Sequence, residues 1–539
     1  MLITGAQAMV KALEAEDVRI IYGYPGAAIC PFIDAIEDSS ITYMLVRHEQ
    51  SAGHAANGCA RITGRPGVCF ATSGPGATNL ITALATAYMD SIPVIAITGQ
   101  VRSDLIGRDV FQEADITGAT EPFTKHSFLL KNAKDLPRVL KEAFFIASSG
   151  RPGPVLIDVP VDVQQSMIEF EYPKSVDIRG YKPNFKGHIL QINRVAESVS
   201  KAKKPVICAG GGIFAAGACK ELTAFAKKCF IPVVTTMMGI GALPTDHPLN
   251  FGMLGSFGVA AANRAIHEAD LLIIVGGRVG DRAVAAPGQI AARTKVVHID
   301  IDPAEIGKNM EAEIPIVGDA KQILHELAEI STPCDSSEWV DYLKNIKSSY
   351  HKPVELRPGF IEPRAFIDDL SARMKDNAVL VSDVGQSQIW CANHYKVCSG
   401  RFLTSGGMGT MGYSIPAAVG VATANPTLEV VAVCGDGAFQ MSMMELATIM
   451  HYRVKLKIII MRNDSLGMVR EIQKSMYHAR YVATTLKGNP DFIALAAAYG
   501  IAGAKINDNS QALEAIDKML SHDGPYLLEC AISPDEASM

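Results

Sequence analysis

Two groups of polar residues stand where apolar runs of the chain end, and their types suit a magnesium ion bound to a diphosphate. Gly435-Asp436-Gly437 follows the run 430–434, and Asn463-Asp464-Ser465 follows the run 456–461. A carboxylate and an amide carbonyl are hard oxygen donors, which Mg²⁺ prefers beside phosphate oxygens. Gly435 and Gly437 let the backbone approach a phosphate, and a following helix N-terminus favours its charge. We therefore predict metal ligation at Asp436, Asn463 and Ser465, the alternative being an ordinary tight turn.

A strand, a helix and a second strand must position these residues. Met443, Leu446, Ala447 and Met450 recur at the i, i+3, i+4, i+7 spacing of a helix between the two apolar runs. The pattern predicts one parallel βαβ unit with a polar group at the carboxyl end of each strand. Open parallel sheets bind their ligands outside those carboxyl ends.

The composition is that of an ordinary globular protein. Of the 539 residues, 48% are hydrophobic and 20% are charged, and the net charge of −6 argues against a nucleic-acid partner. No apolar run approaches the roughly 18 residues that span a membrane, so we expect no membrane association, and we expect no signal peptide. The eleven cysteines contain no Cys-x-x-Cys pair, which favours reduced thiols and a cytoplasmic location.

Alternating apolar runs and helical patterns predict three α/β domains, each a doubly wound parallel sheet. The domains are expected over residues 1–165, 189–330 and 361–539, with linkers over 166–188 and 331–360 where prolines occur and periodicity is weak. The expected strands are 20–22, 43–46, 68–71, 94–98 and 155–159 in the first domain, 206–209, 233–236, 271–275 and 296–299 in the second, and 379–381, 430–434 and 456–461 in the third.

Residues 48–80, HEQSAGHAANGCARITGRPGVCFATSGPGATNL, resemble the first domain of thiamin diphosphate enzymes. The polar groups at Asp436 and Asn463 resemble the diphosphate-binding motif of the same family. The resemblance implies that Glu49 bonds the aminopyrimidine ring of the cofactor, in an apolar site, and promotes loss of the proton from the thiazolium carbon. Without the resemblance, Glu49 would be interpreted as the solvated start of a helix.

Residues 107–116, GRDVFQEADI, and 124–126, TKH, are similar to acetohydroxyacid (acetolactate) synthase, which joins two 2-keto acids with loss of carbon dioxide. The similarity covers essentially the whole chain. It implies that Phe111 and Gln112 line the cofactor pocket and that Arg282 contacts the carboxylate of the acceptor; with Glu49 and Gly26 these form the expected catalytic set. Taken alone, Phe111 would be a core aromatic residue and Gln112 a loop-capping amide.

The same resemblance implies two sets of cofactor-binding residues. Met411 would wedge under thiamin diphosphate and hold its two rings in a V, although alone it is as easily a core methionine. Asp300, after an expected strand, suits a ribose hydroxyl of FAD, which the family holds without using it for redox chemistry. The expected thiamin diphosphate set is Gln386, Ser387, Gly409, Met411, Gly435, Asp436, Gly437, Ala438, Leu466, Gly467 and Met468. The expected FAD set is Arg151, Gly211, Thr236, Met237, Leu254, Gly255, Gly276, Arg278, Asp300, Ile301 and Asp319.

Departures from the family pattern concentrate on substrate recognition. Val161 replaces a Lys, which removes a cation and three hydrogen-bond donors. Ile472 replaces a Trp that selects the second keto acid, Ser256-Phe257 replaces a Met-His pair, and Val279-Gly280 replaces Phe-Asp before Asp281-Arg282. The cofactor residues are intact.

Three hypotheses therefore stay open. The first is a 2-acetolactate-forming carboligase of branched-chain amino acid biosynthesis. The second is another thiamin diphosphate carboligase, lyase or decarboxylase with a different donor or acceptor. The third is a catalytically weak paralogue that serves as an assembly partner, against which Glu49, Asp436 and Asn463 argue. By resemblance, the partners are small 2-keto acids, a second copy of the chain in a homodimer or homotetramer, and a small regulatory subunit.

Overall fold

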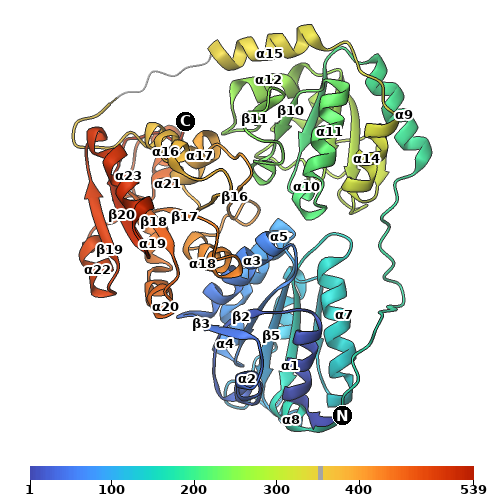
Figure 1. Ribbon diagram of the computed structural model, residues 1–539, viewed down its shortest axis with the longest axis vertical. Coiled ribbons are helices and arrows are strands. Elements are labelled where there is room, and N and C mark those ends of the chain that lie inside the picture. The colour runs from blue at the N-terminus through green and yellow to red at the C-terminus, as the bar shows by residue number, and fades with distance from the viewer. Residues whose placement is uncertain (350–355) are drawn as a thin grey trace.

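The computed structural model describes residues 1–349 and 356–539, which form three α/β domains (Figure 1). Each domain contains a six-stranded sheet whose strands are all parallel. In the first sheet, alternate residues of a strand enter different cores, as Cys69 and Phe70 do. Sheets buried on both faces in this way need helices on both sides, and the predicted fold class is confirmed.

The first domain has the strand order β3-β2-β4-β5-β7-β6. Its strands are β2 (Ile20–Tyr24), β3 (Thr42–Leu45), β4 (Gly67–Ala71), β5 (Val94–Gln100), β6 (His126–Leu129) and β7 (Val155–Pro160). Its helices are α1 (Gly5–Ala15), α2 (Cys30–Glu37), α3 (Glu49–Thr63), α4 (Pro75–Asn79), α5 (Ile81–Asp90), α6 (Ile116–Thr120), α7 (Leu136–Ser148) and α8 (Val161–Gln165).

The middle domain has the strand order β11-β10-β9-β12-β13-β14. Its strands are β9 (Pro205–Ala209), β10 (Val233–Thr235), β11 (Asn250–Met253), β12 (Leu271–Val275), β13 (Lys295–Asp300) and β14 (Ile314–Val317). Its helices are α9 (Ile189–Lys201), α10 (Gly212–Ala215), α11 (Cys219–Cys229), α12 (Ala260–Glu268), α13 (Pro287–Ala291), α14 (Ala320–Ile330) and α15 (Ser337–Ser349).

The third domain has the strand order β16-β15-β17-β18-β20-β19. Its strands are β15 (Val379–Ser382), β16 (Arg401–Leu403), β17 (Val430–Gly435), β18 (Leu456–Arg462), β19 (Ala502–Ile506) and β20 (Tyr526–Ala531). Its helices are α16 (Pro363–Arg373), α17 (Gln386–His394), α18 (Ser414–Ala424), α19 (Asp436–Gln440), α20 (Leu446–His451), α21 (Gly467–Met476), α22 (Phe492–Ala498) and α23 (Ala512–Ser521).

The first and third domains share one topology. When the strands of each domain are counted in chain order, both sheets read 2-1-3-4-6-5, whereas the middle sheet reads 3-2-1-4-5-6. The shared layout of the outer domains is as predicted. The middle order is that of dinucleotide-binding sheets, and in both orders ligands bind where the strand order reverses.

The first and third domains also pack against each other within one chain. Helices α3 and α18 lie side by side at the centre of the molecule (Figure 1). The Tyr22 hydroxyl lies 2.8 Å from the Thr423 hydroxyl, and Glu445 accepts a hydrogen bond from the Arg47 backbone N–H over 3.0 Å. One apolar core is continuous between the two domains.

Both predicted linkers contain regular structure, so the prediction was wrong there. Strand β8 (Met167–Glu169) pairs antiparallel with β1 (Leu2–Thr4), ahead of the first helix. Helix α15 buries Trp339 and Leu343 in the core of the middle domain. Residues 350–355 of the second linker lie outside the described residues. Over the described ranges, no helix is long and apolar enough to cross a membrane.

The expected helix after Gly437 is also broken into pieces. Helix α19 ends at Gln440, a 3-10 turn covers Met443–Glu445, and α20 begins at Leu446. Of the residues at the expected spacing, Leu446 is buried and Met443 and Met450 are partly buried against the same core, but the backbone turns at Ser442. Among the described strands, the sequence did not reveal β1, β6, β8, β11, β14, β16, β19 and β20.

Candidate active site

Three helices of the third domain begin at the carboxyl edge of its sheet. Helix α17 follows β15, α19 follows β17 and α21 follows β18, and these three strands are neighbours. The strand order reverses between β15 and β17. Helix N-termini present free backbone N–H groups and a partial positive charge, so this edge favours an anionic group such as a diphosphate.

Asp436 is the first residue of α19 and lies buried at this edge. Its Oδ2 accepts a hydrogen bond from Asn489 Nδ2 over 2.7 Å, and the same amide donates to Asp464 Oδ1 over 2.7 Å. Burial raises the pKa of Asp436 to about 6. Asn489 was missed from the sequence, because it lies in a turn 53 positions from Asp436 and no local pattern marks it.

Asn463 links two strand ends. Its Nδ2 donates to Gln386 Oε1 over 2.9 Å, and its Oδ1 accepts from the Ser465 backbone N–H over 3.0 Å. Glu471 on α21 accepts from Gln386 Nε2 over 2.9 Å. A side chain at position 467 would overlap this group, since its Cβ would lie 1.8 Å from Gln386 Oε1. A larger residue at 467 would therefore have to displace the Gln386 amide from Asn463.

The described residues of this edge fit a magnesium diphosphate. The hydroxyl of Ser387, at the start of α17, is buried without a hydrogen-bond partner among the residues described. No cluster of three His, Cys, Asp or Glu side chains able to hold a metal occurs in residues 1–349 and 356–539. Asp436 and Asn463 would thus give Mg²⁺ few protein oxygens, and phosphate and water would complete the octahedron, as is usual for this ion.

The loop 405–412 approaches the same edge from β16. Asp383, buried after β15, accepts from the backbone N–H groups of Gly412 over 3.0 Å and Ser414 over 2.8 Å. Burial raises the pKa of Asp383 to about 6. A Cβ at Gly437 would lie 3.6 Å from the Met411 methyl carbon, which puts Met411 beside the first turn of α19. Of the other expected positions, Gly409 lies in this loop, Ala438 lies in α19, Leu466 directly precedes α21 and Met468 lies in the first turn of α21.

Glu49 is the first residue of α3 in the first domain. Its Oε2 accepts from Asn79 Nδ2 over 2.9 Å, and a Cβ at Gly76 would lie 3.2 Å from its Oε1. Gly26 follows the neighbouring strand β2, and a Cβ there would lie 2.6 Å from Thr72. These residues thus gather where the first sheet reverses its strand order. The expected apolar site is not complete, because Glu49 is partly exposed in the single chain.

Phe111 and Gln112 lie in the loop between β5 and α6. The backbone of Gln112 has a φ of 59° and lies against Gly74, where a Cβ would be 3.0 Å from the Gln112 Cα. Phe111 is 87% exposed, which excludes a core role. Among the described residues, no hydrogen bond or ion pair joins Glu49 or this loop to Asp436 or Asn463. The two halves of the expected site are therefore not bonded directly to each other among the described residues.

The positions expected to bind FAD lie at the carboxyl edge of the middle sheet. Every strand of that sheet contributes: Gly211 follows β9, Thr236 and Met237 follow β10, Leu254 and Gly255 follow β11, Gly276 and Arg278 follow β12, Asp300 ends β13 and Ile301 follows it, and Asp319 follows β14. Burial raises the pKa of Asp300 to about 6. Arg151 of the first domain donates to Glu305 over 2.7 Å and contacts Asp302, so it reaches this edge.

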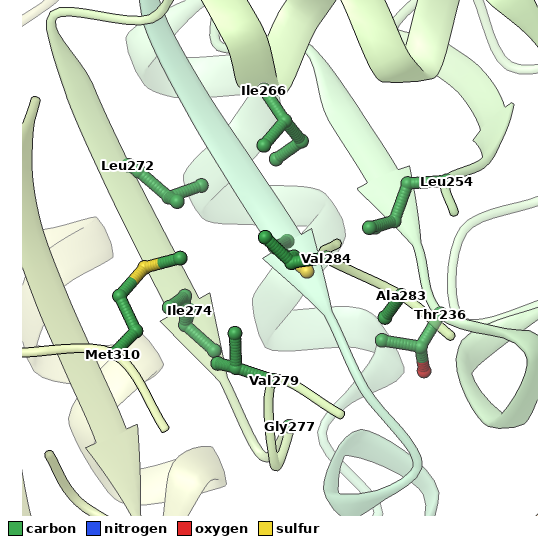
Figure 2. A pocket seen from close by; sticks show the side chains of 11 residues that line it. Thr236, Leu254, Ile266, Leu272, Ile274, Gly277, Val279, Ala283, Val284 and Met310 are labelled. Atoms are coloured by element: carbon green, nitrogen blue, oxygen red, sulfur yellow. The ribbon is translucent and has the colours of Figure 1, made fainter. Parts of the chain in front are cut away.

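A small pocket lies at this edge of the middle sheet, and the side chains of Val279 and Val284 point into it (Figure 2). They pack with Thr236, Leu254 and Ile274 around an apolar cavity of about 10 Å³, which is too small for a cofactor ring. Arg282, between the two valines, points outward and is 83% exposed, with Asp281 at 3.8 Å. Within the described part of the chain, no hydrogen bond or ion pair links Arg282 to Glu49.

Comparison with known proteins agrees with this architecture. Family models of the thiamine pyrophosphate enzymes match all three domains: the N-terminal TPP binding domain over residues 3–119, the central domain over 192–327 and the C-terminal TPP binding domain over 383–530. The chain is 46% identical to a probable acetolactate synthase large subunit of Methanocaldococcus jannaschii, over 99% of this chain and 92% of that protein. It is 44% identical to the acetolactate synthase large subunit of Corynebacterium glutamicum, over 99% and 87%. It is also 45% identical to an acetolactate synthase of Mycobacterium bovis, over 99% and 88%. The chain therefore belongs to the thiamin diphosphate enzymes, in the family of the acetolactate synthase large subunits.

Proposed function

We propose that the chain removes carbon dioxide from pyruvate and joins the remaining two-carbon unit to a second 2-keto acid, as the names of its relatives indicate. The observation that supports this most directly is the pair of strand-end sites, Glu49 in the first domain and Asp436 with Asn463 in the third. When bound, thiamin diphosphate supplies the electron sink that decarboxylation and carbon–carbon bond formation need.

The residues of the chain have distinct roles in this proposal. Asp436, Asn463 and the backbone of Ser465 hold Mg²⁺, and the N-termini of α17, α19 and α21 bind the diphosphate. Met411, which lies beside Gly437, would support the bound cofactor. Glu49, held by Asn79, would bond the aminopyrimidine ring of the bound cofactor and would act there as the proton-transferring group.

A second copy of the chain completes the site in this proposal. Glu49 and Asp436 belong to domains that pack against each other through α3 and α18, yet no hydrogen bond or ion pair of the described residues joins the two clusters. Phe111 stands 87% exposed beside the Glu49 cluster, and Ile472 is 49% exposed on α21. A homodimer is then the smallest active unit. A homotetramer and a small regulatory subunit are further parts of the proposal, as is a cytoplasmic location.

FAD is proposed to lie along the outer carboxyl edge of the middle sheet. The dinucleotide-type strand order and the buried Asp300 support this placement. The small pocket at that edge is filled by Val279 and Val284, so the flavin has to lie outside it. We expect a yellow protein after purification or flavin uptake on incubation with excess FAD. Arg278→Met should weaken flavin binding while thiamin diphosphate binding is retained. A colourless protein that takes up no flavin would contradict the proposal.

The alternative is a related carboligase, lyase or decarboxylase with a different second substrate. Ile472 on α21 and Val161 at the start of α8 favour it, because both stand where the family pattern has substrate-selecting residues. Purified protein with thiamin diphosphate, Mg²⁺ and a panel of 2-keto acids distinguishes the two, by identification of the products. Acetolactate from pyruvate alone supports the first proposal. An aldehyde, or a product of another acceptor, supports the alternative.

A further inference from the structure

The loop 405–412, which carries Gly409 and Met411, is held by the first domain of the same chain. Asp90 Oδ1 accepts from the Gly407 backbone N–H over 2.7 Å, and its Oδ2 accepts from Gly406 over 3.3 Å. The buried hydroxyls of Thr86 and Thr410 lie 2.7 Å apart. Helices α3, α5 and α18 meet around this point (Figure 1). Three hydrogen-bonding groups of one loop are thus fixed by residues more than 300 positions away in sequence.

A side chain at position 407 would collide with residues of the first and middle domains. A Cβ there would lie 2.8 Å from the Met89 carbonyl oxygen, 2.9 Å from Asp90 Oδ1 and 3.0 Å from Arg278 Nη2. The end of α5 therefore touches the backbone of the loop directly. Residues of all three domains meet at this one glycine, next to the residues expected to contact the cofactor.

Asp90 is an unfavourable residue for the stability of its own helix. It is the last residue of α5, and a carboxylate at a helix C-terminus faces the negative end of the helix dipole. Its side chain is completely buried, and Arg61 at 2.7 Å, only 4% exposed, balances its charge. A buried ion pair adds little stability after desolvation. What the carboxylate does provide is two acceptors for the loop that carries Met411.

We propose that Asp90 and Thr86, with Arg61 as the counter-ion, are positioning residues that hold Met411 in place for thiamin diphosphate. This inference rests on the proposed function and deepens it. Thr410, which Thr86 holds, directly precedes Met411 in the chain. Met411 in turn lies beside Gly437 at the start of α19. Met411 therefore connects the hydrogen bonds of Thr86 and Asp90 to the carboxyl edge of the third sheet. Helix α3 carries Glu49 at its first turn and Arg61 in its last. The same helix therefore supports the proton-transferring Glu49 and the loop of Met411.

The test is the double variant Thr86→Val/Thr410→Val. Replacing both hydroxyls by methyl groups of the same shape leaves no orphaned polar partner between them, so folding should be nearly unchanged. We expect the apparent Kd for thiamin diphosphate, measured with saturating Mg²⁺ by calorimetry, to rise roughly 5- to 30-fold, the factor for one or two lost hydrogen bonds. The near-ultraviolet circular dichroism of the bound cofactor should also change, because it reports the geometry of the two rings.

The matched control is Tyr22→Phe/Thr423→Val. It removes another hydroxyl pair, 2.8 Å apart, that joins the same two domains away from the loop. We expect its Kd to stay within about 2-fold of the wild type. Asp90→Asn, which keeps an acceptor for Gly407 but leaves the buried charge of Arg61 without its ion-pair partner, should weaken cofactor binding and lower the thermal midpoint together.

Each outcome decides between the two proposals. Unchanged Kd and circular dichroism in Thr86→Val/Thr410→Val, or an equal effect in Tyr22→Phe/Thr423→Val, would overturn the positioning role. The variant Met411→Ala distinguishes a failure of the positioning role from a failure of the proposed cofactor site. If Met411→Ala weakens binding and the threonine variant does not, only the inference fails. If the wild type binds no thiamin diphosphate, or Met411→Ala has no effect, the cofactor site itself is wrong.

Discussion

The side-chain amide of Asn79 donates a 2.9 Å hydrogen bond to Oε2 of Glu49. Asn79 ends α4, which follows the loop after β4, and Glu49 begins α3 after β3. The bond orients one carboxylate oxygen and leaves the other, Oε1, facing Gly76. A carboxyl group held at one oxygen and free at the other is suited to bonding a ring nitrogen of a cofactor.

Glu49→Gln should therefore lower turnover without affecting the fold. Gln keeps the hydrogen bond to Asn79 but cannot exchange the proton, so we expect kcat to fall roughly two to four orders of magnitude. The Kd for thiamin diphosphate should stay close to that of the wild type. Glu37→Gln, which alters an exposed carboxylate of the same domain, is the control. Turnover near the wild-type rate would remove Glu49 from the mechanism.

Asp436→Ala should raise the requirements for Mg²⁺ and thiamin diphosphate together, because the ion joins the protein to the diphosphate. We expect the apparent constants for both to rise in activation curves measured after treatment with EDTA. Asp368→Ala, an exposed carboxylate of the same domain, should leave both unchanged. If wild-type protein stripped by EDTA were not reactivated by Mg²⁺ and thiamin diphosphate, the metal assignment would be wrong.

Ile472→Trp should change the choice of second substrate. Ile472 is 49% exposed on α21, and a larger ring there would restore apolar contact with one extra methyl group of the acceptor. One methylene is worth about 1–3 kcal/mol in an apolar pocket, or roughly 10- to 200-fold. We expect the wild type to discriminate poorly between pyruvate and 2-oxobutyrate, and the variant to favour 2-oxobutyrate.

A competition assay that compares acetolactate with acetohydroxybutyrate measures this preference. Ile189→Trp, at a similarly exposed isoleucine of the middle domain, controls for the added surface. Strong 2-oxobutyrate preference in the wild type, unchanged by Ile472→Trp, would show that position 472 does not form the acceptor pocket.

The pH dependence of stability should carry a contribution from Asp158. This buried residue of β7 accepts hydrogen bonds from Thr98 over 2.7 Å and Gln100 over 2.9 Å. Burial raises its pKa from 3.8 to about 7. The folded state therefore binds a proton more tightly than the unfolded state, so this contribution to the free energy of unfolding is present below pH 4 and is lost as the pH rises to 7.

Asp158→Asn should make the stability less dependent on pH over that range. An amide cannot titrate, and it still pairs with Thr98 and Gln100. Urea denaturation at several pH values, compared with Asp135→Asn on the surface of the same domain, measures the difference. The same slope in Asp158→Asn and in the wild type would mean that Asp158 is already ionised across this range.

The sequence by itself determined the elements that carry the chemistry. The strands β15, β17 and β18 and the polar residues that end them were predicted from local patterns, because an apolar run that stops at glycine and aspartate is contained within a few positions of the chain. The resemblance carried by residues 48–80 and 107–116 identified the family in the same way. The short edge strands β16 and β19 were not predicted, because three to five residues of mixed polarity form no distinct pattern.

Only the tertiary structure decided how those elements are assembled. Three hydrogen bonds of the site join residues that are far apart in the sequence. Asn489 and Asp436 are 53 positions apart, Asn463 and Gln386 are 77 apart, and Gly407 and Asp90 are 317 apart. No local pattern encodes such pairs, because they arise when whole sheets and helices bury their apolar faces together. The exposure of Phe111 and Glu49 was decided in the same way, since burial depends on which surfaces of the folded chain are covered.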